Sequence, residues 1–295
     1  MTAETIDAIA VPEADIGEAP WRRAWRRLVR RRAAIVGLVV VLLFIAIALA
    51  APLISPYDPL ATSWSAVRKP PSMQHWFGTD EIGRDVLARI IWGARASLLA
   101  GLVSVSLALA IGVPLGLVTG YVGGILDGTF MRVIDAMLAI PFLILAIALA
   151  AFLGPNLTNA MIAIGLSQMP IFVRLTRAQV MSVKHEEYVE AARALGNPHR
   201  RIVLRHIFPN IVPPLLVQAT LAAAAAIIAE ASLSFLGLGQ QPPNPSWGSM
   251  LNTAKNFISQ APWMAFWPGL AIFCLVLSLN LFGDGLRDAL DPRRG

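Results

Sequence analysis

The chain has 295 residues, of which 56% are hydrophobic and only 14% are charged. Soluble globular domains have about 45–50% apolar and about 25% charged residues, so this composition excludes an ordinary soluble enzyme. The formal net charge of +6 does not indicate nucleic-acid binding, because the basic residues lie beside long apolar segments rather than in a separate domain.

Long charge-free segments predict an all-α fold. They indicate a polytopic membrane protein with six transmembrane helices. A spanning helix needs about 20 apolar residues, and a helix satisfies its own backbone in lipid. The alternating polarity of membrane β-strands is absent. The expected spans are Ala33–Ile54, Ser97–Tyr121, Thr129–Leu153, Thr158–Ala178, Asn210–Phe235 and Ala265–Phe282, with a turn at Gly154-Pro155-Asn156 between the third and fourth.

The distribution of Lys and Arg predicts that both termini are cytoplasmic, since 18 of the 24 basic residues then lie inside. Trp21, Trp25 and Leu28 recur at helical spacing among arginines, which fits either a short interfacial helix or a flexible anchor. The expected organisation is a cytoplasmic tail with this basic segment at 1–32, the first transmembrane helix at 33–56, an external loop at 57–96, a five-helix core at 97–284 and a cytoplasmic tail at 285–295.

Three glycines in the second span, Gly112, Gly116 and Gly120, recur every four residues and predict close helix packing. The partner helix could belong to this chain or to another subunit. Polar span residues that could line a path are Gln168, Gln218, Thr220 and Asn280.

Two carboxylates fall within the predicted spans, and intramembrane charges usually mark pairing or function. Asp135 lies at a depth similar to that of Arg174, so we expect an ion pair that fixes helix packing, with a transport role as the alternative. Glu230 has no evident partner in the sequence, and a packing role and a functional role remain equally open. The two carboxylates lie in opposite leaflets and so cannot form one relay.

The internal loop at 177–209 predicts a rigid knob made of two short helices. Glu186–Leu195 (EEYVEAARAL) is rich in helix formers and is followed by Gly196, which suits a helix terminus. Asn197 is then expected to cap a second helix that starts at Pro198 and is closed by Pro209. Ile202, Val203 and Ile207 are expected on parts of the knob surface, through which a soluble partner could push on the adjacent spans.

The order Glu190-Ala191-Ala192, Gly196 and His206-Ile207-Phe208-Pro209 resembles the EAA loop of permease subunits in bacterial binding-protein-dependent ABC importers. His206 and Phe208 depart from the usual Ile-x-Leu-Pro ending. Three further stretches resemble the C-type permease of dipeptide, oligopeptide and nickel importers, and the resemblance extends from Trp21 onward. They are FGTD at 77–80 with GRD at 83–85, ASLSFLGLGQQPPNPSWGSML at 231–251 and FGDGLRDALDP at 282–292.

This resemblance implies a type I permease of the bacterial inner membrane that forms half of a path for di- or oligopeptides, by alternating access. It implies a second homologous permease, two ATP-binding subunits, an external substrate-binding protein and the lipid bilayer as partners. The ATPase-coupling loop would include Glu190, Ala191, Ala192, Gly196, Asn197, Pro198, Phe208 and Pro209. No cofactor, metal or catalytic residue is expected, and the chain has no phosphate-binding motif of its own. Import of nickel chelate or glutathione, an ion-gradient-driven carrier and a membrane scaffold are the alternatives.

Overall fold

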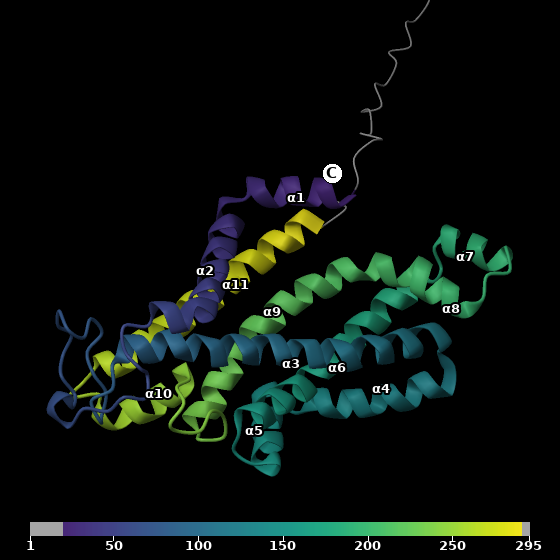
Figure 1. Ribbon diagram of the computed structural model, residues 1–295. Helices are drawn as coiled ribbons and strands as arrows, with labels where there is room; N and C mark the ends of the chain where they lie inside the picture. The colour runs from purple at the N-terminus through teal and green to yellow at the C-terminus, as the bar shows by residue number, and fades with distance from the viewer. Residues whose placement is uncertain (1–19, 291–295) are drawn as a thin grey trace, which may run out of the picture.

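The computed structural model describes residues 20–290, which are almost entirely helical (Figure 1). Within this range no strand forms, and Thr79 and Asp85 make an isolated β-bridge. The helices in chain order are α1 Pro20–Arg30, α2 Arg32–Ile54, α3 Val86–Val122, α4 Gly124–Ala139, α5 Phe142–Leu153, α6 Leu157–Val183, α7 Glu187–Ala194, α8 His199–Arg201, α9 Phe208–Phe235, α10 Trp247–Ala254 and α11 Trp263–Leu290. Short 3₁₀ turns lie at Trp64–Ala66 and Lys255–Phe257.

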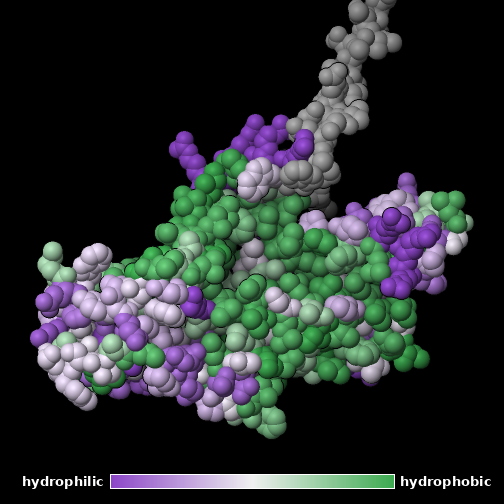
Figure 2. Space-filling model, in the orientation of Figure 1, coloured by the Kyte–Doolittle hydropathy of each residue, from purple (hydrophilic) through white to green (hydrophobic). Residues whose placement is uncertain are grey.

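An apolar belt separates two hydrophilic ends of the molecule (Figure 2). One end carries α7 and α8, and we call residues 184–207 the knob. The opposite end carries residues 55–85 and 236–262, which we call the cap (Figure 1). Four described helices are long and apolar enough to cross a membrane, namely α2, α3, α9 with its N-terminal extension, and α11. The chain is therefore an all-α membrane protein, as the sequence predicts.

The third predicted span, Thr129–Leu153, is not one straight helix. α4 and α5 meet at a bend of 94° around Ile140 and Pro141, and together they make up a fifth span only if this broken pair crosses the membrane. Pro141 lacks the N–H that would continue the helix, and it disfavours helical geometry at Ile140. The fourth predicted span lies inside α6, which is 27 residues long and carries Arg174 and Arg177 near its end.

Two predicted boundaries are wrong because charged residues continue the helices. α3 begins at Val86 rather than Ser97, with the Asp85 carboxylate accepting the Ala88 N–H at 2.7 Å as its cap. The loop predicted to be external therefore ends at residue 85. α11 runs to Leu290 instead of ending at Phe282, so the described part of the predicted tail is helical. The rest of the two predicted tails, 1–19 and 291–295, lies outside the described residues.

The central packing contact joins α3 to α6 through the predicted glycine stripe. A Cβ on Gly116 would lie 2.5 Å from Thr176 Cβ, and one on Gly112 would lie 2.8 Å from Phe172 Cβ. Gly120 likewise faces Val180 and the Arg177 carbonyl. The partner helix thus belongs to the same chain, which resolves the alternative that the sequence leaves open.

The ends of the described chain lie side by side (Figure 1). α1 is helical, as the interfacial interpretation predicts, and its Leu28 is buried against Ala289 and Phe282 of α11 and Ala34 of α2. Arg31 pairs with Asp288. This arrangement agrees with termini on one side of the membrane.

Candidate functional site

The knob contains the first helix that the sequence predicts, and Gly196 terminates it. Gly196 has φ +75°, its N–H bonds to the Arg193 carbonyl at 3.0 Å, and the Asn197 N–H bonds to the Ala192 carbonyl at 3.3 Å. This pair of bonds is a Schellman motif, which needs a left-handed residue at the glycine position. The turn between the knob helices is therefore fixed by backbone geometry.

The second knob helix differs from the prediction at both ends. Pro198, not Asn197, occupies the N-cap position of α8, and the Asn197 amide donates to the Ala192 carbonyl at 2.9 Å. Pro209 does not close the helix. Instead a π-helical segment, Ile202–Ile207, joins α8 to α9 without a break, and the Phe208 N–H bonds to the Val203 carbonyl. A wide turn of this kind accommodates the proline ring and its missing donor.

The buried side chains of the knob extend the main hydrophobic core of the protein. Val189 and Ala192 of α7 are buried, as are Ile202 and Ile207 of the π segment. The expectation that Ile202 and Ile207 lie on the surface is wrong, because these side chains are buried in the main core. Val203 is partly exposed. The outward face carries the exposed residues Glu190, Ala191 and Leu195, the last 83% exposed. Phe208 is partly buried and Pro209 is exposed at the base.

Three polar contacts fasten the knob and its base to the ends of neighbouring helices. Tyr121 Oη of α3 lies 2.7 Å from His199 Nδ1, and Lys184 Nζ donates to the Gly120 carbonyl at 3.0 Å. Arg177 of α6 donates to both carboxylate oxygens of Asp127 in α4, at 2.6 and 2.7 Å. A displacement of the knob would therefore be transmitted to α3, α4, α6 and α9 together.

The predicted Asp135–Arg174 ion pair forms between α4 and α6. Both side chains remain more than half exposed, so the pair positions the two helices at low electrostatic cost. The sequence indicates this pair but not the partly buried Arg177–Asp127 pair one turn further along α6. The Arg177–Asp127 pair could have been found in the same way, because these two opposite charges lie at similar depths at the ends of adjacent spans.

Glu230 does have partners, which the sequence did not reveal. Its carboxyl group is fully buried in α9. It accepts a hydrogen bond from Ser97 of α3 at 3.2 Å and from Ser234 at 2.7 Å, and it also bonds Ser246 at the start of α10. Glu230 thus joins α3, α9 and the cap at one point.

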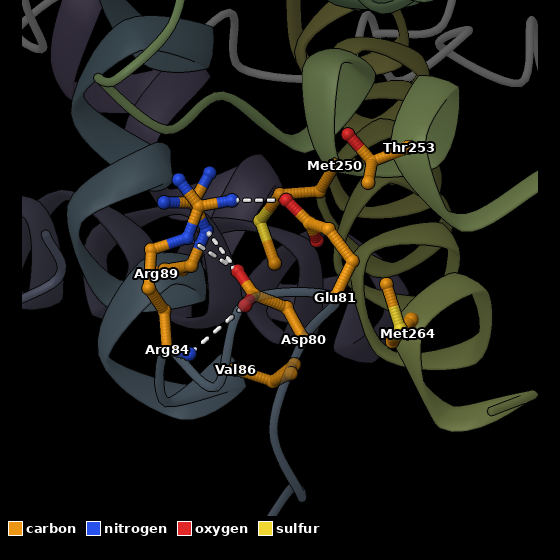
Figure 3. A pocket seen from close by; sticks show the side chains of 8 residues that line it. All are labelled: Asp80, Glu81, Arg84, Val86, Arg89, Met250, Thr253 and Met264. Atoms are coloured by element: carbon orange, nitrogen blue, oxygen red, sulfur yellow. Dashed lines mark hydrogen bonds and ion pairs between the residues drawn. The ribbon is translucent and has the colours of Figure 1, made fainter. Parts of the chain in front are cut away.

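The FGTD and GRD motif at 77–85 forms a compact charged network in the cap (Figure 3). Asp80 accepts the Arg84 side chain at 2.6 Å and backbone N–H at 2.9 Å, and it lies 3.5 Å from Arg89 Nε of α3. Arg89 also donates to the Pro59 carbonyl at 3.2 Å. Burial, with the neighbouring Asp80 charge second, raises the pKa of Glu81, which pairs with Arg84.

Trp247, in the stretch at 231–251 that carries part of the family resemblance, is fully buried. Its Nε1 donates to the Ile90 carbonyl at 3.1 Å, and its ring packs edge-on against Phe44 of α2. The stretch from Ser246 to Leu251 therefore has a structural role, while Pro242, Pro243 and Asn244 are exposed beside it.

The geometry defines a class of protein, a multi-helix membrane subunit with a protruding knob at one polar end and a cap at the other. Residues 112–295 match the family described as binding-protein-dependent transport system inner membrane component, and residues 19–71 match the N-terminal transmembrane domain of oligopeptide transport permease C. The chain belongs to this binding-protein-dependent permease family and is a multi-pass protein of the bacterial inner membrane.

Individual relatives agree with this assignment. The chain is 48% identical over 275 residues to a dipeptide transport system permease protein of Alkalihalophilus pseudofirmus, which covers 93% of this chain and 90% of the relative. It is 47% identical over 247 residues to a glutathione transport system permease protein of Escherichia coli O6:K15:H31. This alignment covers 83% of this chain and 82% of that relative. An inward-facing structure of the MetNI methionine ABC transporter shares the fold, with a TM-score of 0.58 at 21% identity, over 70% of this chain and 97% of that one.

Proposed function

We propose that this chain forms one half of the translocation path of an importer for di- or oligopeptides, and that a second homologous permease forms the other half. The dipeptide permease relative supports the substrate class. The glutathione permease relative makes glutathione, itself a small peptide, the second candidate. Nickel chelate remains an alternative that rests on the sequence resemblance.

The observation that carries the coupling proposal is the knob, which is stiffened by its Schellman turn and anchored to the main core by its buried side chains. We propose that the knob faces the cytoplasm, as the charge distribution predicts, and that one of two ATP-binding subunits docks on the face with Glu190, Ala191 and Leu195. ATP is then bound by those subunits rather than by this chain. ATP-driven closure of the pair moves α3, α6 and α9 through the knob contacts, which shifts the path between inward-open and outward-open states.

The intramembrane carboxylates support this energy source over an ion gradient. Asp135 pairs with Arg174, and Glu230 is bonded to serine hydroxyls. Residues already committed to such contacts are poorly placed to pick up and release a proton during transport. Gln168, a candidate path residue, is buried and donates to the Ala222 carbonyl at 2.9 Å.

The test is reconstitution of the assembled importer in liposomes with its external binding protein. We expect peptide uptake that needs ATP and does not proceed under an ion gradient alone. Glu190→Lys should leave the protein in the membrane but abolish uptake and uncouple ATP hydrolysis from the binding protein. Arg132→Glu, a charge reversal on an exposed residue of α4, is the matched control and should transport normally. Normal uptake by Glu190→Lys would reject the docking face, and uptake without ATP would favour a gradient-driven carrier.

A further inference from the structure

A large apolar groove opens between α2 on one side and α3, α9 and α11 on the other. Its volume is about 540 Å³. Leu98, Leu99 and Leu102 of α3 face Ile45 and Leu49 of α2 across it. Ligand sites of this size are usually apolar with a few polar groups that fix orientation. Here Arg95 is the charged residue in the lining.

Arg95 is held in place by a defect in α2. Pro52 has no N–H, so the Ala48 carbonyl one turn earlier lacks its helical donor. Arg95 Nε donates to this carbonyl at 2.6 Å, and Nη2 lies 3.5 Å from the Leu49 carbonyl. The guanidinium also lies 4.8 Å from the centre of the Trp92 ring. Its position is therefore set by three contacts, all with uncharged groups.

Among the described residues no carboxylate pairs with Arg95, whereas at least one carboxylate pairs with each of Arg31, Arg84, Arg89, Arg174 and Arg177. A charge within a membrane helix requires a counter-ion or access to the interface. Arg95 lies nine residues from the start of α3, or about 14 Å along the helix axis. A counter-ion for Arg95 would therefore come from outside the described residues, near the cap end of the apolar belt.

We propose that this groove is a binding site for an anionic phospholipid. Its phosphate pairs with Arg95, whose planar guanidinium suits phosphate oxygens, and one acyl chain lies along Leu98, Leu99 and Leu102. A helix of a second permease could also fill an apolar groove, but it would need a carboxylate at this depth, and such residues are rare in membrane helices. Basic sites between membrane helices bind lipid headgroups by the same chemistry.

The test measures lipid retention by the assembled importer, without substrate, using native mass spectrometry. The purified complex is delipidated and then titrated with phosphatidylglycerol or phosphatidylcholine that carry the same acyl chains. We expect wild type to retain phosphatidylglycerol about fivefold more tightly than phosphatidylcholine, the ratio typical of one basic contact. Arg95→Gln should remove this preference. Leu102→Trp, which fills the groove from an exposed position, should weaken binding of both lipids.

Two matched variants control for general effects. Arg132→Gln removes an exposed arginine of α4, and Leu216→Trp enlarges an exposed residue of α9 outside the groove. Both should behave as wild type. Equal retention of the two lipids, or a preference unchanged in Arg95→Gln, would overturn the proposal. So would a disulfide between Leu102→Cys and the second permease, since that would put a protein helix in the groove. None of these results depends on the transported substrate.

Discussion

Arg177 holds Asp127 with two parallel hydrogen bonds of 2.6 and 2.7 Å, which tie the knob end of α6 to the start of α4. The two residues are 50 positions apart in the chain and their side chains are 26% and 15% exposed. Bidentate geometry of this kind adds orientation as well as energy. The pair thus makes α4 and α6 move together when the knob is displaced.

Breaking this pair should weaken the coupling region without unfolding the membrane core. We expect Asp127→Asn to lower stability by about 1 kcal/mol, between the values for exposed and buried charge pairs. The measurement is the thermal unfolding midpoint of the purified complex together with ATP-dependent uptake. Restoration of both by the swap Asp127→Arg with Arg177→Asp would identify the pair as the cause. A single variant that is as stable as wild type would show that the pair contributes nothing.

The α3–α6 contact should not tolerate a larger residue at its closest point. A methyl group at Gly116 would lie 2.5 Å from Thr176 Cβ and 2.7 Å from the Val173 carbonyl. Gly116→Ala should therefore destabilise the protein by about 1–3 kcal/mol, the usual cost of overpacking. Gly269→Ala in α11 is the control, because nothing lies within 4 Å of its Cβ. That control should be neutral or stabilising by about 0.5–1 kcal/mol, and equal destabilisation by both would rule out the packing argument.

Gly196 should be needed for its backbone conformation rather than for space. Its φ is +75° and no atom lies within 4 Å of a Cβ built there. Gly196→Ala should cost about 1 kcal/mol of strain and reduce ATP-driven uptake. Gly237→Ala is matched, with φ +82° and equally open surroundings in the Schellman turn that ends α9. Equal loss of uptake in the two variants would show that the effect is general strain and not a property of the knob.

Glu230 should be sensitive even to its isosteric amide. Ser234 Oγ already accepts the Gln240 N–H at 3.0 Å and Ser246 Oγ accepts the Ser249 N–H at 3.2 Å, so each is arranged to donate its proton to Glu230. In Glu230→Gln an N–H₂ group would face these donors, at a cost of about 1–3 kcal/mol. Hydrogen exchange of the α10 amides should report the loosening, with Ser232→Ala as a control on the exposed Ser232 hydroxyl. Unchanged exchange at α10 in Glu230→Gln would contradict this account.

The cap should lose stability as the pH rises above 4.5, the ordinary pKa of Glu81 in the unfolded chain. Burial raises the pKa of Glu81 in the folded state, so the folded cap binds more protons than the unfolded one. The stabilisation is present below the unfolded pKa and is lost as pH rises through the folded pKa. Hydrogen exchange at residues 80–86 from pH 4 to pH 7 tests this, and Glu81→Gln should flatten the profile. A profile that is the same in the variant would exclude Glu81 as the source.

Simple sequence rules predicted four features correctly. They are the helical membrane class, most span centres, the α7 helix with its Gly196 terminus and the Asp135–Arg174 pair. Hydropathy, helix propensity and the conformational freedom of glycine act over a few residues, so a single sequence displays them. Errors occurred where charges interrupted an apolar pattern. The charges of Arg89 and Arg95 suggested that the second span starts at Ser97. Both arginines instead lie inside α3, where Arg89 pairs with Asp80 and Arg95 donates to the Ala48 carbonyl.

The amino-acid sequence alone therefore determined that the protein lies in a membrane, that it has a helix-glycine-helix segment, and which permease family it resembles. Only the tertiary structure decided that the glycine stripe packs on α6, that Glu230 meets serines of two other elements, and that Arg95 caps a carbonyl freed by Pro52. These contacts join residues up to 133 positions apart. Their geometry depends on how whole helices cross and bend, which no local pattern of residues specifies.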